Sequence, residues 1–214
     1  MTVGTVSVRN RSFRSRTAYL ARRALSMEIG IWASLYRFLF RRPRVPAGAA
    51  GFTYHRQVST ILVVFIVLSA VEIPIVDLVV QRWEAVRIGF LVLGFWGLTW
   101  MIGLGLGYLT RPHAVGPEGL RVRNGAETDV ALAWDDVHSV TLGKHTDEPK
   151  APRVTMDGTG RRTLWIRMQN ETNIEIALER PMVVRLPSGE ETTDVVRLWV
   201  DEPKPFMDEV RKYL

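Results

Sequence analysis

The sequence contains no cysteine, and its first 109 residues contain no lysine. Without cysteine the chain cannot form disulfides or bind metals through thiolates, and this absence is typical of proteins kept in a reducing cytoplasm. Charged residues of either sign are absent from Ile88 to Leu109, a run of 22 positions. About 20 apolar residues are enough for a helix to cross the hydrocarbon core of a bilayer.

A second apolar stretch, Ser59–Val80, lies just before this run. Only residues 81–87 separate the two stretches, so the second must return in the opposite direction to the first. Together they predict a helical transmembrane hairpin over residues 57–109, with spans at 59–80 and 88–109.

Positive charge is concentrated in the first half of the chain. Residues 1–109 hold 13 Arg and 4 acidic residues (13 − 4 = +9), whereas residues 110–214 hold 15 Lys plus Arg and 18 acidic residues (15 − 18 = −3). A nucleic-acid-binding protein normally carries its positive charge on the folded domain, so we expect no nucleic-acid partner. Eleven of the arginines precede the first span, which predicts that both termini of this cell-membrane protein are cytoplasmic.

Residues 17–41 have the periodicity of an amphipathic helix, and residues 1–16 have the polar, Arg-rich composition of a disordered segment. The polar face of the helix and its C-terminal end supply candidate contacts for an anionic inner leaflet: Arg22, Arg23, Arg37, Arg41 and Arg42. The alternative is that the helix packs on the protein's own domain or on a partner. Glu28 lies within the apolar arc and favours a protein contact, because lipid offers it no hydrogen-bond partner.

Glu72 is the most unusual residue of the first span, because a carboxyl group near the middle of a bilayer is costly and is usually functional. In an antiparallel hairpin, Trp96 lies level with Glu72 and Thr99 lies one turn further in. We expect the Trp96 indole or the Thr99 hydroxyl to hydrogen-bond Glu72. A contact with a membrane partner and a role in a proton or ion relay are the alternatives.

Two further features of the spans concern packing. Asp77 lies near the predicted outer interface, where Arg82 or Arg87 is within reach. Gly103 and Gly107 form a Gly-x-x-x-Gly pair, which allows close approach of another helix. That helix is expected to be the first span or a helix of another chain.

After Gly116 the hydrophobic pattern alternates with period two, as in Leu164-x-Ile166-x-Met168 and Ile174-x-Ile176-x-Leu178. Turn signals such as Asn124-Gly125 and Asp157-Gly158 separate these runs, which predicts seven or eight short strands. Phe206, Val210 and Tyr213 then share one face of a C-terminal helix. About seven strands followed by a helix predict a β-rich domain over residues 110–214 with a pleckstrin-homology (PH)-like fold.

The stretches Glu118–Gly125, Val130–Trp134 and Asp136–Val140 resemble the opening of bacterial PH-like domains that follow a two-helix membrane hairpin. The resemblance covers roughly residues 55–214. It implies a membrane-anchored cytoplasmic domain without assigned catalytic residues, in a family whose members are mostly uncharacterised.

No arrangement of residues in the sequence is typical of an active site. His138 and His145 lack the converging ligands that a zinc site needs, and no nucleophile elbow or phosphate-binding loop is present. We therefore expect no enzymatic activity, no metal and no cofactor. The expected function is a membrane-anchored adaptor or accessory subunit with a protein partner or a second copy of itself. The alternative is a small oligomeric transport or proton-handling protein that uses Glu72.

Overall fold

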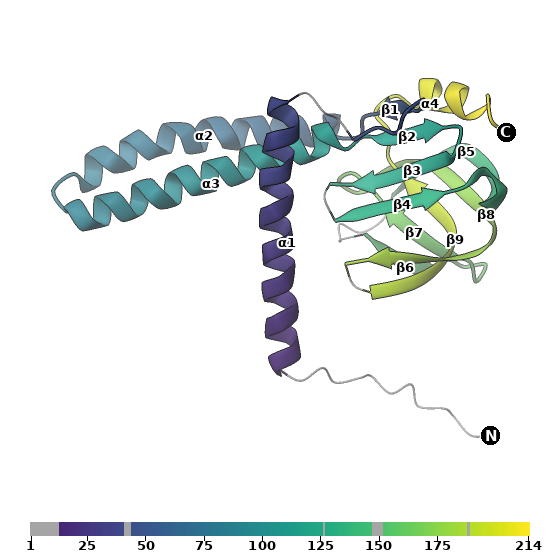
Figure 1. The fold of residues 1–214 in the computed structure, drawn as a ribbon, viewed down its shortest axis with the longest axis horizontal. Coiled ribbons are helices and arrows are strands. Elements are labelled where there is room, and N and C mark those ends of the chain that lie inside the picture. The colour runs from purple at the N-terminus through teal and green to yellow at the C-terminus, as the bar shows by residue number, and fades with distance from the viewer. Residues whose placement is uncertain (1–12, 41–43, 126, 147–151, 188) are drawn as a thin grey trace.

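The computed structural model describes residues 13–40, 44–125, 127–146, 152–187 and 189–214, with the backbone alone for residues 13–23 and 26. Three long helices come first: α1 (Phe13–Leu39), α2 (Arg56–Val80) and α3 (Glu84–Thr110). The antiparallel α2–α3 hairpin projects from one side of a β-rich body, and α1 crosses it almost at a right angle (Figure 1).

Both hairpin helices are long and apolar enough to cross a membrane, and they contain the two predicted spans. Only residues 81–83 separate them, because α3 begins at Glu84, within the segment predicted as the connection. The most apolar stretch of each helix is only 6% buried within the molecule.

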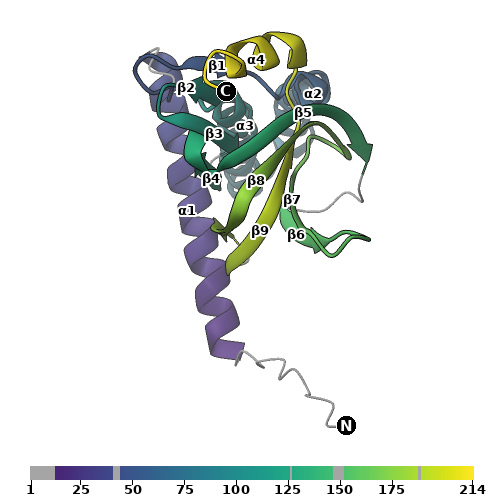
Figure 2. The ribbon, with the colours of Figure 1, turned by 90° about the vertical axis from the view of Figure 1, so that its right-hand side faces the viewer.

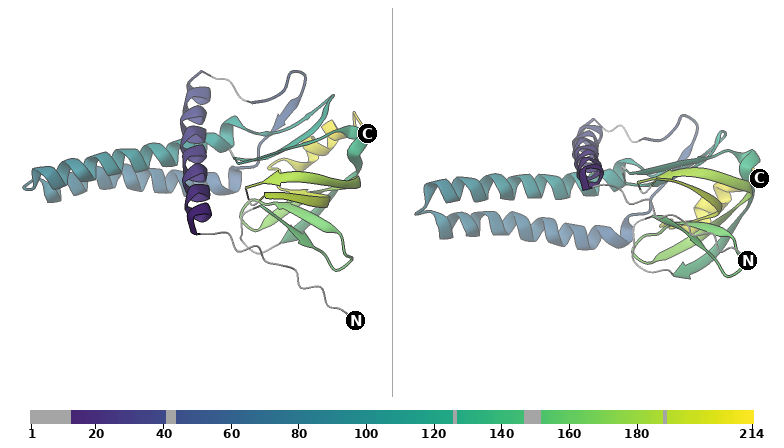
Figure 3. Two further views of the ribbon diagram at one scale, coloured as in Figure 1. Left: turned by 60° about the horizontal axis from the view of Figure 1, so that its bottom comes forward. Right: turned by 90° about the horizontal axis from the view of Figure 1, so that it is seen from below.

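Helix α1 begins at Phe13, so the last four residues of the segment predicted as disordered are helical. Residues 1–12 lie outside the described part of the chain. Helix α1 lies on the side of α3 that faces away from α2 (Figure 3).

The first sheet has four antiparallel strands in the order β1-β2-β3-β4: β1 (Ala50–Phe52), β2 (His113–Gly116), β3 (Gly119–Asn124) and β4 (Thr128–Leu132). Strand β1 was not predicted. It precedes the hairpin in the chain yet pairs with β2, which follows the hairpin, in the register Ala50↔Val115. The domain predicted over residues 110–214 therefore also contains residues from before α2.

A short 3-10 turn, η1 (Trp134–Asp136), leads into a second sheet of five strands in the order β5-β8-β9-β7-β6. These are β5 (Val137–Thr146), β6 (Arg153–Met156), β7 (Arg162–Ile166), β8 (Glu171–Leu186) and β9 (Gly189–Leu198). Strands β7 and β9 run parallel, which an up-and-down meander does not produce. Strand β8 continues well beyond the alternating run Ile174–Leu178, with a register shift against β9 between Ala177 and Met182.

The two sheets enclose one core, which the C-terminal helix α4 (Pro203–Val210) closes (Figure 2). The alternation of period two places Leu120, Val122, Leu164 and Ile176 inside, each at most 1% exposed. Helix α4 buries Phe206, Met207 and Val210, and Tyr213 stacks on Trp134 with ring centroids 5.3 Å apart. Burial of this apolar surface is the main stabilising term of the β-rich body.

Candidate functional site

The region where α1, the end of α3 and the first sheet meet gathers most of the unusual side chains of the molecule. It begins with a close helix crossing. A Cβ atom on Gly103 would lie 2.3 Å from Cγ2 of Ile31, and one on Gly107 would lie 3.5 Å from the Ser34 hydroxyl. Gly103 and Gly107 thus allow α1 to contact α3, whereas the sequence suggested the first span or another chain as the partner.

Glu28 holds the same crossing together through hydrogen bonds. Its Oε1 accepts one from the indole N–H of Trp32 at 3.3 Å and another from Trp96 at 3.2 Å. The protein contact that this carboxyl group favours is therefore formed, and it joins α1 to α3.

The opposite face of α1 is apolar and uncovered. Four of its large side chains recur at helical spacing and are more than half exposed: Leu25, Ile29, Trp32 and Tyr36. Helix α1 therefore has one apolar side against α3 and a second that nothing in the described molecule covers. Among the predicted lipid-contact residues, Arg41 and Arg42 lie outside the described residues, and only the backbone of Arg22 and Arg23 is described.

The base of the hairpin is fixed to the first sheet by buried polar side chains. His113, on β2, is 1% exposed and accepts a 3.0 Å hydrogen bond at Nδ1 from the Arg123 amide. Its Nε2 donates to the Trp199 carbonyl at 3.1 Å. These two bonds fix the neutral tautomer, and burial lowers the pKa of His113 to about 4.

Tyr54, just before α2, packs against His113 with a ring separation of 4.4 Å. Its hydroxyl accepts a 2.8 Å hydrogen bond from the Gly125 amide in the turn between β3 and β4. Burial raises the pKa of this phenol well above its usual range. Both connections between hairpin and sheet are therefore rigidly packed.

Arginines surround this base. Arg123, on β3, is 1% exposed, donates to the carbonyls of Arg44 and Pro112, and forms a 3.3 Å ion pair with Asp129. Arg111, in the connection from α3 to β2, is 6% exposed. Arg37, predicted as a lipid contact, lies half-buried near Arg111 and lowers its pKa, after the larger effect of burial.

A groove of about 250 Å³ opens between α1, α3 and the β3–β4 turn, and none of these arginines lines it. Its walls combine apolar side chains of α1 and α3 with polar residues of the turn, one of them acidic: Met27, Ile31, Trp100, Asn124, Glu127 and Thr128. A mainly apolar groove with a polar end is suited to an amphipathic molecule.

The polar residues within the hairpin do not form the predicted cluster. Trp96 donates to Glu28, and Thr99 donates to the carbonyl of Phe95 in its own helix at 2.8 Å. Glu72 is exposed and has no hydrogen-bond partner among the described residues, so the predicted bond from Trp96 or Thr99 is not formed. Glu72 lines a second groove of about 300 Å³ between α2 and α3.

The expected pairing of Asp77 is confirmed. Arg87 donates to both carboxylate oxygens of Asp77, at 2.5 and 2.9 Å, and so joins the end of α2 to the start of α3 beside the turn that connects them. Fork-to-fork pairing of this kind is the strongest geometry available to an arginine and a carboxylate.

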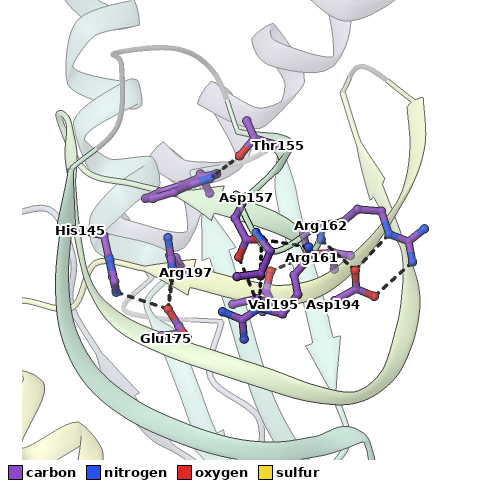
Figure 4. Close-up of polar contacts among 12 residues, drawn as sticks. His145, Thr155, Asp157, Arg161, Arg162, Glu175, Asp194, Val195 and Arg197 are labelled. Carbon is purple, nitrogen blue, oxygen red and sulfur yellow. Dashed lines mark hydrogen bonds and ion pairs between the residues drawn. The ribbon is translucent and has the colours of Figure 1, made fainter.

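The second sheet carries a separate set of ion pairs on its surface (Figure 4). Glu175 accepts a 2.7 Å hydrogen bond from Arg197 and lies 3.3 Å from His145, while Arg197 stacks 4.8 Å from the centre of the Trp165 ring. Arg162 pairs with Asp194 and holds the pKa of that carboxyl group below its usual value. These contacts join neighbouring strands.

His138 bonds Glu179 and does not meet His145. No group of three or more His, Cys, Asp or Glu that could hold a metal ion occurs among the described residues. The arrangement at the base of the hairpin is instead suited to binding a ligand, because it offers cationic side chains, amide groups and an apolar groove.

Neither sequence nor structure comparison relates the chain to a known protein. No family model matches it, and no similar curated protein or solved structure was found.

Proposed function

We propose that this chain is a non-enzymatic adaptor or accessory subunit, anchored in a membrane by the α2–α3 hairpin, that presents a PH-like domain at the inner leaflet. The observation that carries the proposal is a contrast in burial. The β-rich body encloses its own apolar core, whereas the most apolar stretch of each hairpin helix is only 6% buried. Apolar surface of that extent has to be covered by lipid or by another protein.

The position of α1 supports the membrane placement. Helix α3 has 27 residues, or about 40 Å at 1.5 Å per residue, against a hydrocarbon core of about 30 Å. If the core begins near Ile88, it ends about 20 residues later, near Gly107. Helix α1 crosses there at nearly a right angle (Figure 1), so it would lie in the membrane plane with its exposed apolar side toward lipid.

The architecture of the body supports the PH-like interpretation. Two sheets enclose one core, and a C-terminal amphipathic helix covers its open end. The parallel β7–β9 pair and the added strand β1 depart from that plan. A fold of this kind presents strand edges and loops to partners, and Met156 and Val183 are examples of exposed apolar side chains there.

Glu72 supports a partner within the membrane. Its carboxyl group lies in the groove between α2 and α3, on the lipid-facing surface of the proposed anchor. Lipid cannot satisfy a carboxyl group, so a helix of a partner protein or of a second copy would stabilise it. Anionic lipid at the inner leaflet is the other proposed neighbour.

The proposed topology can be tested by cysteine labelling, because the chain has no native cysteine. Gln81→Cys places a thiol in the α2–α3 turn and Thr159→Cys places one in an exposed turn of the second sheet. In intact cells a membrane-impermeant maleimide should label only the first variant, and in inside-out vesicles only the second. Labelling of Thr159→Cys in intact cells would overturn the orientation.

The adaptor role can be tested by site-specific photocrosslinking in native membranes. A photoreactive residue at Val79 reports on the hairpin, and one at Met156 reports on the β-rich body; both native side chains are more than 70% exposed. The proposal expects one recurrent adduct of defined mass at one of these positions. Only lipid adducts at Val79 and no adduct at Met156 would contradict it.

A small transport or proton-handling protein is the second candidate, because Glu72 lies in a groove rather than in a packed interface. In that case the protein in liposomes should conduct protons or ions, and Glu72→Gln should abolish the flux while the thermal unfolding midpoint stays the same. If the wild-type protein shows no flux, the transport function is ruled out.

A further inference from the structure

Five arginines from four separate segments converge where α1, the α3–β2 connection and β3 meet. They are Arg37, Arg44, Arg111, Arg121 and Arg123, here called the arginine cluster. Electrostatic repulsion from Arg37, Arg44 and Arg123 acts on Arg111, and repulsion from Arg121 and Arg44 acts on Arg123. Hydrogen bonds show the same proximity: the Arg44 amide donates to the Thr110 carbonyl, and the Arg123 guanidinium donates to the carbonyls of Arg44 and Pro112, on either side of Arg111.

The arginine cluster has too little negative charge around it. Within the described residues, Asp129 is the one carboxylate that forms ion pairs with it, at 3.3 Å from Arg123, 3.7 Å from Arg121 and 3.8 Å from Arg44. Five positive charges and one negative charge leave a surplus of four. Asp129 does not pair with Arg37 or Arg111 in the described structure.

Three guanidinium nitrogens of the cluster are buried without a hydrogen-bond partner among the described residues. They are Nη1 of Arg37, Nε of Arg111 and Nη2 of Arg123. A buried donor without an acceptor is destabilising, and a buried charge without a counterion is more so. Three such donors on three elements are the arrangement expected of a site that receives an anion.

We propose that Arg37, Arg111 and Arg123 form a binding site for a phosphate group. A tetrahedral phosphate offers several oxygen acceptors to donors that converge from different directions, and arginine matches their geometry better than lysine does. The cluster contains no lysine, as the whole first half of the chain contains none. Arg44 and Arg121 lie further out and add positive potential around the site.

The neighbouring groove favours a lipid headgroup as the source of this phosphate. Ser34 of the groove lies one helical turn before Arg37, and Gly107 lies one turn before Arg111. None of the five arginines lines the groove itself, but its α1 and α3 walls end one turn from Arg37 and Arg111, so an acyl chain in the groove and a phosphate at the cluster would be neighbours. This lipid source rests on the proposed membrane placement, whereas binding of a soluble phosphate would not.

The test measures phosphate binding by the full-length protein in detergent. Native mass spectrometry with added phosphatidic acid, and with phosphatidylcholine as the zwitterionic reference, reports lipid retention. Thermal unfolding with inorganic phosphate, against chloride at equal ionic strength, reports binding of the soluble anion. We expect one retained phosphatidic acid per chain, or a rise in the unfolding midpoint with inorganic phosphate alone, and the arm that responds identifies the source.

Arg111→Gln and Arg37→Gln remove one charge each without shortening the side chain greatly, and each should weaken binding at least about tenfold. The matched control is Arg56→Gln at the same end of the hairpin, where Arg56 is exposed and pairs with Glu202. The control should bind as the wild type does. Absence of binding in both arms, unchanged binding by both cluster variants, or equal weakening by Arg56→Gln would overturn the site.

These outcomes are independent of the adaptor role. If the protein binds phosphate but yields no crosslinked partner, the arginine site is supported and the adaptor role is contradicted. If it yields a crosslinked partner but binds no phosphate, the adaptor role is supported and the arginine site is contradicted.

Discussion

The indole N–H of Trp96, on α3, donates a 3.2 Å hydrogen bond to the carboxylate of Glu28, on α1. The same carboxylate oxygen accepts from Trp32 of α1 itself, so two indoles fix one acidic side chain. Together with the close approach of Ile31 to Gly103, this bond ties α1 to one position along α3.

Glu28→Leu should therefore loosen α1 from α3, because both indole donors lose their acceptor. The expected loss of stability is about 1 kcal/mol, in the range of hydrogen bonds between membrane helices. Hydrogen exchange of the α1 amides should accelerate, while exchange in β8 should not change. Glu84→Leu, at the exposed start of α3, is the control and should leave α1 protected.

Gly103→Ala should separate the same two helices by steric conflict. The new Cβ would lie 2.3 Å from Cγ2 of Ile31 and 3.3 Å from its Cβ, and a rotamer change moves only the first of these atoms, so the helices must also shift slightly apart. Overpacking of this kind costs about 1–3 kcal/mol. Thermal unfolding in detergent measures the loss.

Gly97→Ala is the matched control for that substitution, since a Cβ at Gly97 meets nothing within 4 Å. It should be neutral or slightly stabilising, because alanine favours a helix more than glycine does. The pair Gly103→Ala and Ile31→Ala should recover part of the lost stability. If Gly97→Ala proved as damaging as Gly103→Ala, the crossing would not be the cause.

The Asp77–Arg87 pair should hold the outer ends of α2 and α3 together. Asp77→Asn and Arg87→Gln are each expected to lower the unfolding midpoint, and the exchanged pair Asp77→Arg with Arg87→Asp should restore much of it. Arg82→Gln, in the same turn, serves as the control. A double exchange no better than either single change would show that the pair contributes little.

His113 should make stability depend on pH between about 6.5 and 4. Its pKa falls from 6.5 in the unfolded chain to about 4 in the folded protein, so the unfolded state binds the proton first as pH falls. Stability is therefore fully present above pH 6.5 and is lost progressively toward pH 4, by about 3 kcal/mol in total. Unfolding midpoints across this range measure the effect.

His113→Asn should flatten that profile, because an amide keeps one donor and one acceptor but does not titrate in this range. His138→Asn, which alters an exposed histidine paired with Glu179, should leave the profile as it is. An unchanged slope in His113→Asn would assign the pH dependence to other groups.

The parts of this structure that follow from local pattern were predictable, and the parts that depend on distant contacts were not. The uncharged run 88–109 and the alternation in Leu164-x-Ile166 each carry their own signal, so helices α2 and α3 and most strands were expected. Strand β1 has only three residues, Ala50-Gly51-Phe52, between proline- and glycine-containing segments, and its partner lies beyond the hairpin.

In the candidate site, too, features set by local sequence were predictable and features set by distant contacts were not. A helical wheel places Met27 and Ile31 on one face of α1 but does not say that α3 covers it, so Gly103 was assigned a different partner. Arg37, Arg111 and Arg123 look unrelated in the sequence, and only the tertiary fold gathers them. Glu72 and Trp96 match in depth, yet Glu28 is the nearer acceptor for the indole.

The pairing of β1 with β2 has a consequence for how the protein is made. The two strands flank the hairpin in the chain. During synthesis, β1 therefore leaves the ribosome first, and it can pair with β2 only after α2 and α3 have also been made. Completion of the β-rich body therefore depends on synthesis of the hairpin. A soluble fragment starting at residue 110 would leave the backbone of β2 open along one edge, ready to pair with another molecule.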